Sequence, residues 1–448
     1  MNIDDTITAI STPPGKGGIG IIRISGRISY KIGKLITGSD MDPRKAHLSK
    51  FYNLDKEMID SGIVIFFKSP NSFTGEDIVE IQAHGSPVTL DMILDVVVKS
   101  GARLAKPGEF TERAFLNNKI DLTQAEAIAD LISSNSIKAA KSATRSLQGE
   151  FSKKINDILK SLIGIRKNIE AEIDFPEESY FCDREKIFQE IQTIINKVVN
   201  VLDLSKQSIL FHDGLTVGII GKPNSGKSSL FNALMGEERA IVTKIEGTTR
   251  DTIHGFFNYN GMTIKLIDTA GIRESQDIIE NKGIKLTIDT INIVDHIIIL
   301  IDITNDINET KKFIKRFCKI NKKTTYTYVY NKVDLIKNKS RLNDLVKQIL
   351  VSSKEKIGIE ELKKVIFMST GLKEENTEGI LNARRRHIIS LNTALECLYI
   401  SKRQLIKNDL LLVAEDLKNV QKELSTITGE FYTEDLLEEI FSSFCIGK

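Results

Sequence analysis

Two kinds of hydrophobic periodicity divide the chain. Outside a central region, apolar residues recur every three or four positions, which predicts long amphipathic helices. The predicted stripes are Phe151, Ile155, Ile158, Leu162, Ile165, Ile169 and Ile173; Ile187, Ile191, Ile194, Ile195, Val198 and Leu202; and Ile388, Leu391, Leu395, Leu398, Leu417, Val420, Leu424 and Ile427. Because the third stripe lies far along the chain, the pattern favours one helical domain interrupted by an inserted domain.

In the central region, short apolar runs alternate with helical segments. Strands are predicted at Leu215–Ile220, Met262–Asp268, His296–Asp302 and Thr325–Tyr330, and a closing helix at Ile359–Phe367. Such alternation predicts an α/β domain with a doubly wound, mainly parallel sheet.

The first part of the chain predicts a small α+β domain. Strands are expected at residues 20–25, Ser61–Phe67 and Asp77–His84, and a helix at Val88–Ser100. The segment Gly15–Gly20 has the spacing of a dinucleotide-binding fingerprint, but a strand pattern follows it where that motif requires a helix. The predicted division is an α+β N-terminal domain (1–118), an α-helical domain in two parts (119–213 and 373–448) and the inserted α/β domain (214–372).

Composition excludes several classes of protein. The 448 residues carry 62 basic and 60 acidic side chains, a formal net charge of +2, so any contact with RNA must come from local patches. No apolar run is long enough to cross a bilayer, and the acidic N-terminus lacks a signal pattern. Four scattered cysteines, Cys182, Cys318, Cys397 and Cys445, suit a reducing compartment. We therefore expect a cytoplasmic protein without a membrane partner.

A glycine-rich stretch, Gly221–Ser229, lies between a predicted strand and a predicted helix over Lys227–Met235. Its spacing is that of a phosphate loop, in which backbone N–H groups and the positive end of a helix dipole converge on an anion. Lys227 is expected to reach the outer phosphates, and the hydroxyl of Ser228 to ligate Mg²⁺. Alone, such a motif also occurs as a surface turn, so the rest of the chain decides.

Two further motifs close later strands in the order that a GTPase requires. Asp268–Gly271 places a carboxylate near the Mg²⁺ shell and a backbone N–H near the γ-phosphate. In Asn331–Asp334, the aspartate suits guanine, whose edge offers two N–H donors, whereas adenine would leave this carboxylate unpaired. Ser352–Lys354 follows the next apolar run and can complete the base pocket. Together these motifs predict a P-loop GTPase domain.

A threonine-rich segment, Thr243–Asp251, occupies the place of a first switch, where the hydroxyl of Thr249 could complete the Mg²⁺ shell. The predicted GTP site comprises Asn224, Ser225, Gly226, Lys227, Ser228, Ser229, Thr243, Lys244, Ile245, Glu246, Gly247, Thr248, Thr249, Asp268, Thr269, Ala270, Gly271, Asn331, Lys332, Asp334, Ser352, Ser353 and Lys354. Ile272 stands where many GTPases carry the glutamine that orients the attacking water, so another group must do this.

Five other stretches are more specific than the phosphate loop. They are Phe73-Thr-Gly-Glu-Asp77, Pro107-Gly-Glu-Phe-Thr-Glu-Arg-Ala-Phe115, Asp121-Leu-Thr-Gln-Ala-Glu-Ala127, Ala383-Arg-Arg-Arg-His387 and Ile440-Phe-Ser-Ser-Phe-Cys-Ile-Gly-Lys448. With the nucleotide motifs, they make the whole chain resemble the tRNA-modification GTPase family MnmE (TrmE).

This resemblance implies a function that composition does not show. Members of that family form homodimers through the N-terminal domain and work with a flavin-dependent (FAD) partner, MnmG. Together they install an aminomethyl or carboxymethylaminomethyl group at the 5-position of the wobble uridine of certain tRNAs, with the added carbon supplied by a tetrahydrofolate derivative. The residues that match the family's folate-binding positions are Arg23, Glu80, Lys119 and Lys448. Without the family match, each of these would be taken as a solvated surface charge.

The resemblance also implies how GTP hydrolysis proceeds without the glutamine. In the family, a K⁺ ion is caged when two GTPase domains meet, and Asn224, Thr243, Ile245 and Thr248 match the caging positions. Glu280, twelve residues after Asp268, matches a carboxylate that helps to orient the attacking water. The predicted catalytic residues are therefore Glu280, Lys227 and Thr249.

Two other functions would also explain some of these motifs. A ribosome-assembly GTPase without modification activity would have the same nucleotide motifs, but the N-terminal domain and the C-terminal tail argue against it. A binding protein with a degenerate nucleotide site is disfavoured by the intact Lys227, Ser228, Thr249 and Asp268.

Overall fold

The computed structural model describes residues 5–134, 136–175, 183–212, 214–222, 224–236, 253–268, 294–304, 325–336, 348–371 and 381–447; for residues 207–212, 253–254 and 268 it describes the backbone alone. The chain forms two compact units. The first comprises Met1–Ile132, Ser146–Val198 and Ile389–Lys448, and the second comprises Ser133–Arg145 and Val199–Ile388.

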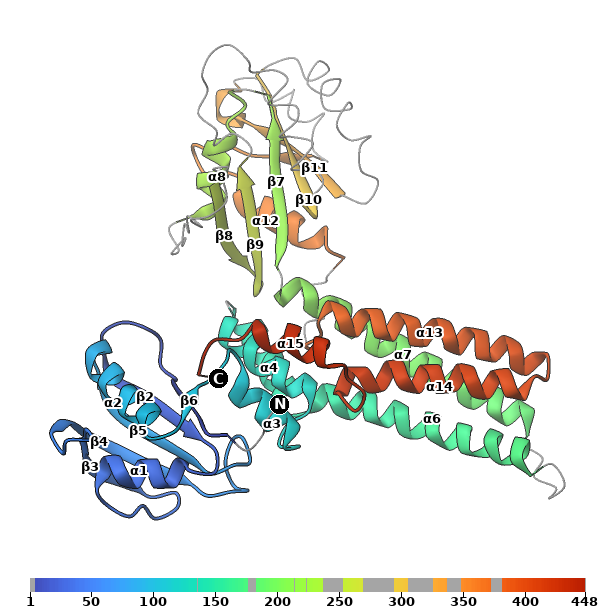
Figure 1. The fold of residues 1–448 in the computed structure, drawn as a ribbon. Coiled ribbons are helices and arrows are strands. Elements are labelled where there is room, and N and C mark those ends of the chain that lie inside the picture. Colours follow the sequence, from blue (N-terminus) through green and yellow to red (C-terminus); the bar gives the residue numbers. More distant parts are fainter. Residues whose placement is uncertain are drawn as a thin grey trace, which may run out of the picture. The chain divides into compact units, whose positions relative to one another are not determined.

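A mixed sheet opens the first unit (Figure 1). Its strands are β1 (Ile7–Ile10), β2 (Gly17–Ser25), β3 (Ala46–Tyr52), β4 (Met58–Phe67), β5 (Ile78–Gly85) and β6 (Arg103–Leu104), in the order β3-β4-β5-β2-β1-β6. Helices α1 (Ser29–Thr37) and α2 (Pro87–Lys99) supply Ile32, Ile36, Leu90 and Ile93 to the core on one face. The residues that alternate with this core, among them Arg23 and Glu80, lie on the opposite face.

The predicted strands of this sheet and helix α2 are present, with ends shifted by one to three residues. Strands β1, β3 and β6 and helix α1 were not predicted, because they are short or carry a mixed polar pattern without a clear period.

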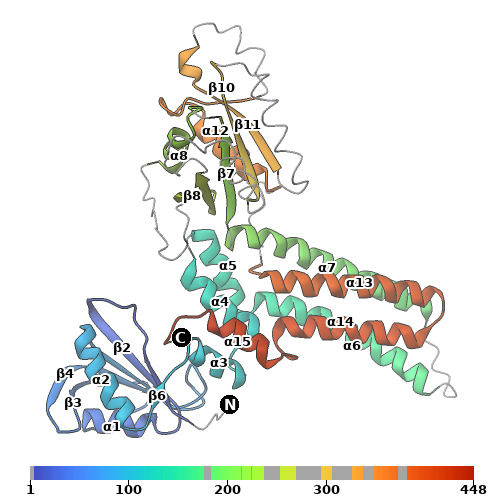
Figure 2. The same ribbon diagram turned by 45° about the horizontal axis from the view of Figure 1, so that its top comes forward.

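Helices make up the rest of the first unit. They are α3 (Glu109–Leu116), α4 (Leu122–Ser133), α6 (Glu150–Asp174), the first part of α7 (Arg184–His212), most of α13 (Arg385–Ile406), α14 (Leu410–Thr428) and α15 (Glu434–Ser442). Both views show α6, α7, α13 and α14 side by side (Figures 1 and 2). Along α6 the predicted stripe is buried from Phe151 to Ile169 and ends at Ile173, which is half-buried. The stripes of α7 and α14 are buried throughout.

The second unit contains the predicted doubly wound sheet. Its elements are β7 (Leu215–Gly221), α8 (Lys227–Met235), β8 (Ile253–Tyr259), β9 (Met262–Asp268), β10 (His296–Asp302), β11 (Thr325–Asn331), the 3₁₀ turn η1 (Val333–Leu335), β12 (Ile349–Leu350) and α12 (Ile359–Met368), with α5 (Ile137–Leu147) beginning in this unit. The strand order is β12-β11-β10-β7-β9-β8, and all neighbouring pairs are parallel except β8 with β9. Strand β8 was not predicted.

The core of this second unit lies on both faces of the sheet. Val217 and Ile219 of β7 pack with α8 and α12 on one face, whereas Ile220 packs with β10 and β11 residues on the other. All seven residues of β10 are buried. Burial on both faces explains why β7 and β10 have nearly continuous apolar sequences.

The predicted fold class is confirmed, whereas the predicted four-part domain boundaries stay a prediction. The two helical blocks lie largely within one compact unit, interrupted in sequence by residues of the other. Among the described helices, none combines the length and apolar content needed to cross a membrane.

His296 at the start of β10 is a buried titratable group. Its side chain is 1% exposed, and its ring nitrogens lie 2.7 Å and 3.0 Å from the hydroxyls of Thr325 and Thr327. Burial lowers the pKa of His296 to about 4, so the folded protein holds a neutral ring that the unfolded chain protonates below about pH 6.5.

We therefore predict that this unit loses stability as the pH falls from 7 to 5, since the unfolded state binds the additional proton. His296→Gln should reduce this pH-dependent loss by about 2 kcal/mol. Denaturant unfolding at both pH values measures the effect, with His47→Gln in the first unit as the control. An unchanged pH dependence in His296→Gln would show that the buried ring does not contribute.

Candidate functional site

The glycine-rich loop connects β7 to α8, as the sequence predicted. Asn224 and Gly226 have φ angles of 61° and 94°, in the left-handed region that favours glycine. A Cβ atom on Gly226 would lie 2.3 Å from Nδ2 of Asn331, so no larger residue fits there. The ammonium of Lys227 donates to the carbonyl oxygens of Gly221 and Lys222, both at 3.1 Å. The loop therefore wraps around the Lys227 ammonium at the N-terminus of α8, where Ser228 and Ser229 form the first turn.

Asn331, at the carboxyl end of β11, joins this loop to the segment after β12. Its Nδ2 donates to the carbonyl oxygen of Ser225 at 2.9 Å. Its Oδ1 accepts from the backbone N–H of Ser353 at 3.1 Å and from the Ser353 hydroxyl at 2.9 Å. Asn331 is 2% exposed, so one buried amide links three predicted parts of the nucleotide site.

Lys332 and Asp334, which belong to the same motif as Asn331, are also held by neighbouring side chains. The hydroxyl of Ser352 donates to Oδ1 of Asp334 at 2.6 Å, which orients the carboxylate predicted to read guanine. Lys332 adopts a φ of 70°, and its ammonium lies 2.6 Å from Oδ2 of Asp302. Burial by itself raises the pKa of Asp302, but hydrogen bonds from Lys332 and Thr304 outweigh it and lower the pKa. Asp302 is therefore held as an anion that anchors Lys332.

Asp302 was not among the predicted site residues. It ends β10, between the strands that lead into the phosphate loop and into Asn331. A carboxylate that ends a strand with a continuous apolar run before it, at the edge where the other motifs lie, was the available signal.

Part of the predicted nucleotide site lies outside the described residues. This holds for Thr243, Lys244, Ile245, Glu246, Gly247, Thr248, Thr249, Thr269, Ala270, Gly271 and Glu280. The backbone of Asp268 ends β9 beside Ile219 of β7, one strand from the phosphate loop. Lys354 is exposed in the turn after β12.

Two predicted folate residues form one ion pair in the first unit. Nε and Nη2 of Arg23 lie 2.9 Å and 2.8 Å from Oε1 of Glu80, on neighbouring strands. The Arg23 guanidinium lies 5.6 Å from the ring centroid of Phe73 and 5.7 Å from that of Phe110. These aromatic contacts, which the sequence did not predict, hold a pair whose side chains remain 23% and 16% exposed.

Of the other two predicted folate residues, the structure describes Lys119 but not Lys448. Nζ of Lys119 donates to the carbonyl oxygen of Pro70 at 2.8 Å, near the start of the loop that carries Phe73. Lys448 lies outside the described residues, but its neighbour Gly447 docks on the N-terminal domain, where its carbonyl oxygen accepts from the hydroxyl of Ser11 at 3.1 Å. Gly447 therefore lies beside Ser11, the residue directly after β1.

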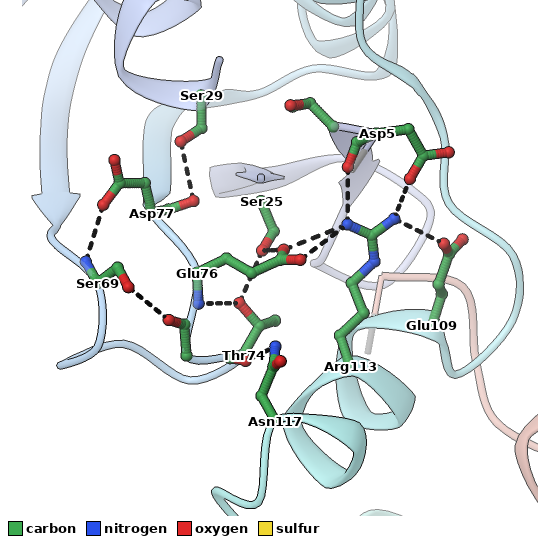
Figure 3. A network of polar contacts seen from close by, with 12 residues as sticks. Asp5, Ser25, Ser29, Ser69, Thr74, Glu76, Asp77, Glu109, Arg113 and Asn117 are labelled. Carbon is green, nitrogen blue, oxygen red and sulfur yellow. Dashed lines mark hydrogen bonds and ion pairs between the residues drawn. The ribbon is translucent and has the colours of Figure 1, made fainter. Parts of the chain in front are cut away.

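Arg113 lies at the centre of a polar network between two family-typical motifs (Figure 3). The guanidinium is 5% exposed and lies 2.5 Å from a carboxylate oxygen of Asp5, 3.1 Å from one of Glu76 and 3.0 Å from one of Glu109. Burial alone would lower the pKa of Arg113, but the three carboxylates raise it. Glu76 also accepts from the hydroxyl of Ser25 at 2.7 Å. The network therefore fixes the 73–77 loop against α3 and β2.

Five parallel strands, a phosphate loop and a base-recognition motif at their carboxyl ends define a P-loop GTPase. Residues 6–119 match the family model for the GTP-binding protein TrmE N-terminus, and residues 122–445 match that for the MnmE helical domain. The tRNA modification GTPase MnmE of Francisella tularensis subsp. novicida is 49% identical over 454 residues, and the protein of that name from Francisella philomiragia subsp. philomiragia is 48% identical, each over 100% of both chains. The chain belongs to the tRNA modification GTPase MnmE family.

Solved structures match part of the chain. The G domain of the T. maritima FeoB iron transporter is 27% identical, covering 35% of this chain and 99% of that chain with a TM-score of 0.28. Era in a complex with MgGDPNP and 16S ribosomal RNA nucleotides is 24% identical, covering 41% and 66%, with a TM-score of 0.29. At these TM-scores we base no argument on the likeness.

We predict that Asn331→Ala weakens GTP binding by at least about tenfold, because the phosphate loop and the Ser352–Lys354 segment lose the amide that joins them. Titration with a fluorescent GTP analogue measures the affinity. Asn258→Ala, on strand β8 of the same unit, is the control and should bind normally. Normal affinity in Asn331→Ala would mean that the two segments are held independently of this side chain.

Proposed function

We propose that the described phosphate loop and base-pocket residues bind GTP, with Lys227 on the outer phosphates, Ser228 on Mg²⁺ and Asp334 on the guanine edge. The observation that carries this assignment is the Asn331 bridge, which brings the phosphate loop and the Ser353 segment to one place. The chain is a tRNA modification GTPase by family, and these residues are our assignment for the part of its GTPase site that falls within the described residues.

The remaining nucleotide contacts are proposed from the sequence. Asn224, Ser225, Gly226 and Ser229 complete the phosphate loop; Thr243, Lys244, Ile245, Glu246, Gly247, Thr248 and Thr249 form the first switch; Asp268, Thr269, Ala270 and Gly271 form the second; and Asn331, Lys332, Ser352, Ser353 and Lys354 surround the base. Thr249 is assigned to Mg²⁺, Asn224, Thr243, Ile245 and Thr248 to K⁺, and Glu280 to orientation of the attacking water. A K⁺ ion in this cage would supply positive charge where the transition state accumulates negative charge.

We further propose that the GTPase cycle drives addition of an aminomethyl or carboxymethylaminomethyl group to the 5-position of a wobble uridine. The chain acts in the cytoplasm as a homodimer with an FAD-dependent MnmG-type partner. A tetrahydrofolate derivative supplies the added carbon. Its site contains Arg23, Glu80, Lys119 and Lys448.

The described N-terminal residues fit such a carrier. The Arg23 guanidinium lies near the aromatic rings of Phe73 and Phe110 and pairs with the Glu80 carboxylate, and both side chains stay partly exposed. A pterin has a flat ring and a hydrogen-bonding edge, which suit the exposed part of a paired carboxylate and guanidinium. Lys119 adds a further cation close to the Phe73 loop.

Nucleoside analysis of tRNA tests the modification activity. Cells without this protein should lose the 5-substituted wobble uridines, and a plasmid copy of the wild-type chain should restore them. Lys227→Ala should fail to restore them, because the outer phosphates lose their cation. Unaltered wobble uridines in cells lacking the protein would favour the ribosome-assembly alternative.

Potassium dependence tests the proposed hydrolysis mechanism. We predict that GTP turnover is at least about tenfold faster in KCl than in NaCl at equal ionic strength, since the ion replaces the charge that an arginine supplies in other GTPases. Asn224→Ala should lose this difference while keeping measurable GTP binding. Equal wild-type rates in the two salts would exclude the K⁺ cage and direct attention to Arg250 or Arg273.

A further inference from the structure

The face of the N-terminal sheet that carries Arg23 and Glu80 continues beyond them. Along β5, Ile81 and Ala83 belong to the core on the covered face, so Glu80, Gln82 and His84 share the opposite face. Glu80 pairs with Arg23 at one end of this row, and His84 lies four residues further, about 14 Å along the strand. An elongated ligand that contacts Glu80 can therefore reach His84.

His84 has a defined orientation although its side chain is 72% exposed. Its backbone N–H donates to Oδ2 of Asp60 at 2.9 Å, and its Nδ1 lies 2.8 Å from Oδ1 of the same carboxylate. Asp60 is 12% exposed and also accepts from the backbone N–H of Ser61 at 2.8 Å. Burial alone would raise the pKa of Asp60, but the hydrogen bonds from His84 and Ser61 lower it, so the carboxylate is ionised.

An ionised carboxylate only accepts hydrogen bonds, so Nδ1 of His84 carries the proton and Nε2 is available to a ligand. The surroundings of the ring are mostly cationic. Lys50 of β3 pairs with Ser61, the neighbour in β4 of the Asp60 that holds His84. Lys16 lies next to Gly17, which pairs with Gly85. Both lysines are exposed, and besides Asp60 the acidic group on this row is Glu80, which Arg23 already pairs.

Glycines keep space open at this end of the face. A Cβ atom on Gly85 would lie 2.6 Å from the carbonyl oxygen of Gly17, so the two strands approach as only glycine permits. A Cβ atom on Gly18 would meet nothing within 4 Å, and residues 13–19 are exposed. The glycine-rich segment that resembled a dinucleotide fingerprint therefore borders an open, cationic end of the row.

We propose that His84 is a ligand-binding residue of the folate site and that it holds the carboxylate tail of the carrier, with Asp60 as its positioning residue. This inference rests on the proposed folate function. The pterin edge of the folate contacts Glu80, its p-aminobenzoyl ring lies over Gln82, and its glutamate tail reaches His84 and Lys16. A protonated His84 ring donates from both nitrogens, one to Asp60 and one to the tail.

Calorimetric binding of two probes to the full chain tests this assignment. The first probe is 5-formyltetrahydrofolate, which has a glutamate tail, and the second is 6-methyltetrahydropterin, which has none. His84→Gln should weaken binding of the tailed probe about three- to fivefold, the range of one exposed charge-assisted contact, and leave the tail-less probe unchanged.

His47→Gln is the matched control, because His47 pairs with Val64 and so lies on the covered side of the same sheet. It should change neither affinity. Asp60→Asn should also weaken the tailed probe alone, since it removes the charge that orients the ring. An equal loss for both probes, or no loss for the tailed probe, would overturn the role of His84 while leaving the folate function standing. Failure of the wild-type chain to bind either probe would overturn both.

Discussion

The side-chain amide of Asn331 is the contact on which the described nucleotide site depends. A buried amide must satisfy both its donor and its acceptor, and Asn331 does so by bonding Ser225 of one loop and Ser353 of another. No aspartate or leucine of similar size could do both. Because α8 begins directly after the phosphate loop, this amide also sets the distance between the phosphate end and the base end of the site. The tight approach at Gly226 follows from it, since the Asn331 amide occupies the space that a side chain there would need.

Arg113 has the corresponding role in the N-terminal domain. Its contact with Asp5 joins residues 108 positions apart, and its contact with Glu76 holds the 73–77 loop in place. Phe73 of that loop lies beside the Arg23 guanidinium, so the buried network helps to position the partly exposed Arg23–Glu80 pair. Removing one partner from such a network leaves buried charge uncompensated, which is more costly than the net contribution of the pair.

Sequence periodicity predicted the elements whose burial is regular. Strands β9 and β10 have the predicted bounds: β10 is covered on both faces and has a nearly continuous apolar run, whereas β9 alternates buried apolar residues with half-buried polar ones. The stripes of α6, α7 and α14 were equally clear. Strand β8 was missed because it is an antiparallel edge strand that contains Gly255 and Asn258, both unusual in strands. Helix α1 was missed because polar residues interrupt its short apolar pattern.

The sequence by itself determined the order of the nucleotide motifs and the family, and it predicted a preference for guanine through Asp334, because each is carried by residue types at short spacing. Tertiary structure decided which distant side chains meet: Asp302 with Lys332, Asp60 with His84, and Gly447 with Ser11. These pairings depend on strand order and register, which local periodicity does not encode. For the same reason, the sequence alone did not single out His84. The position of His84 on β5 places it in the row that begins at Glu80.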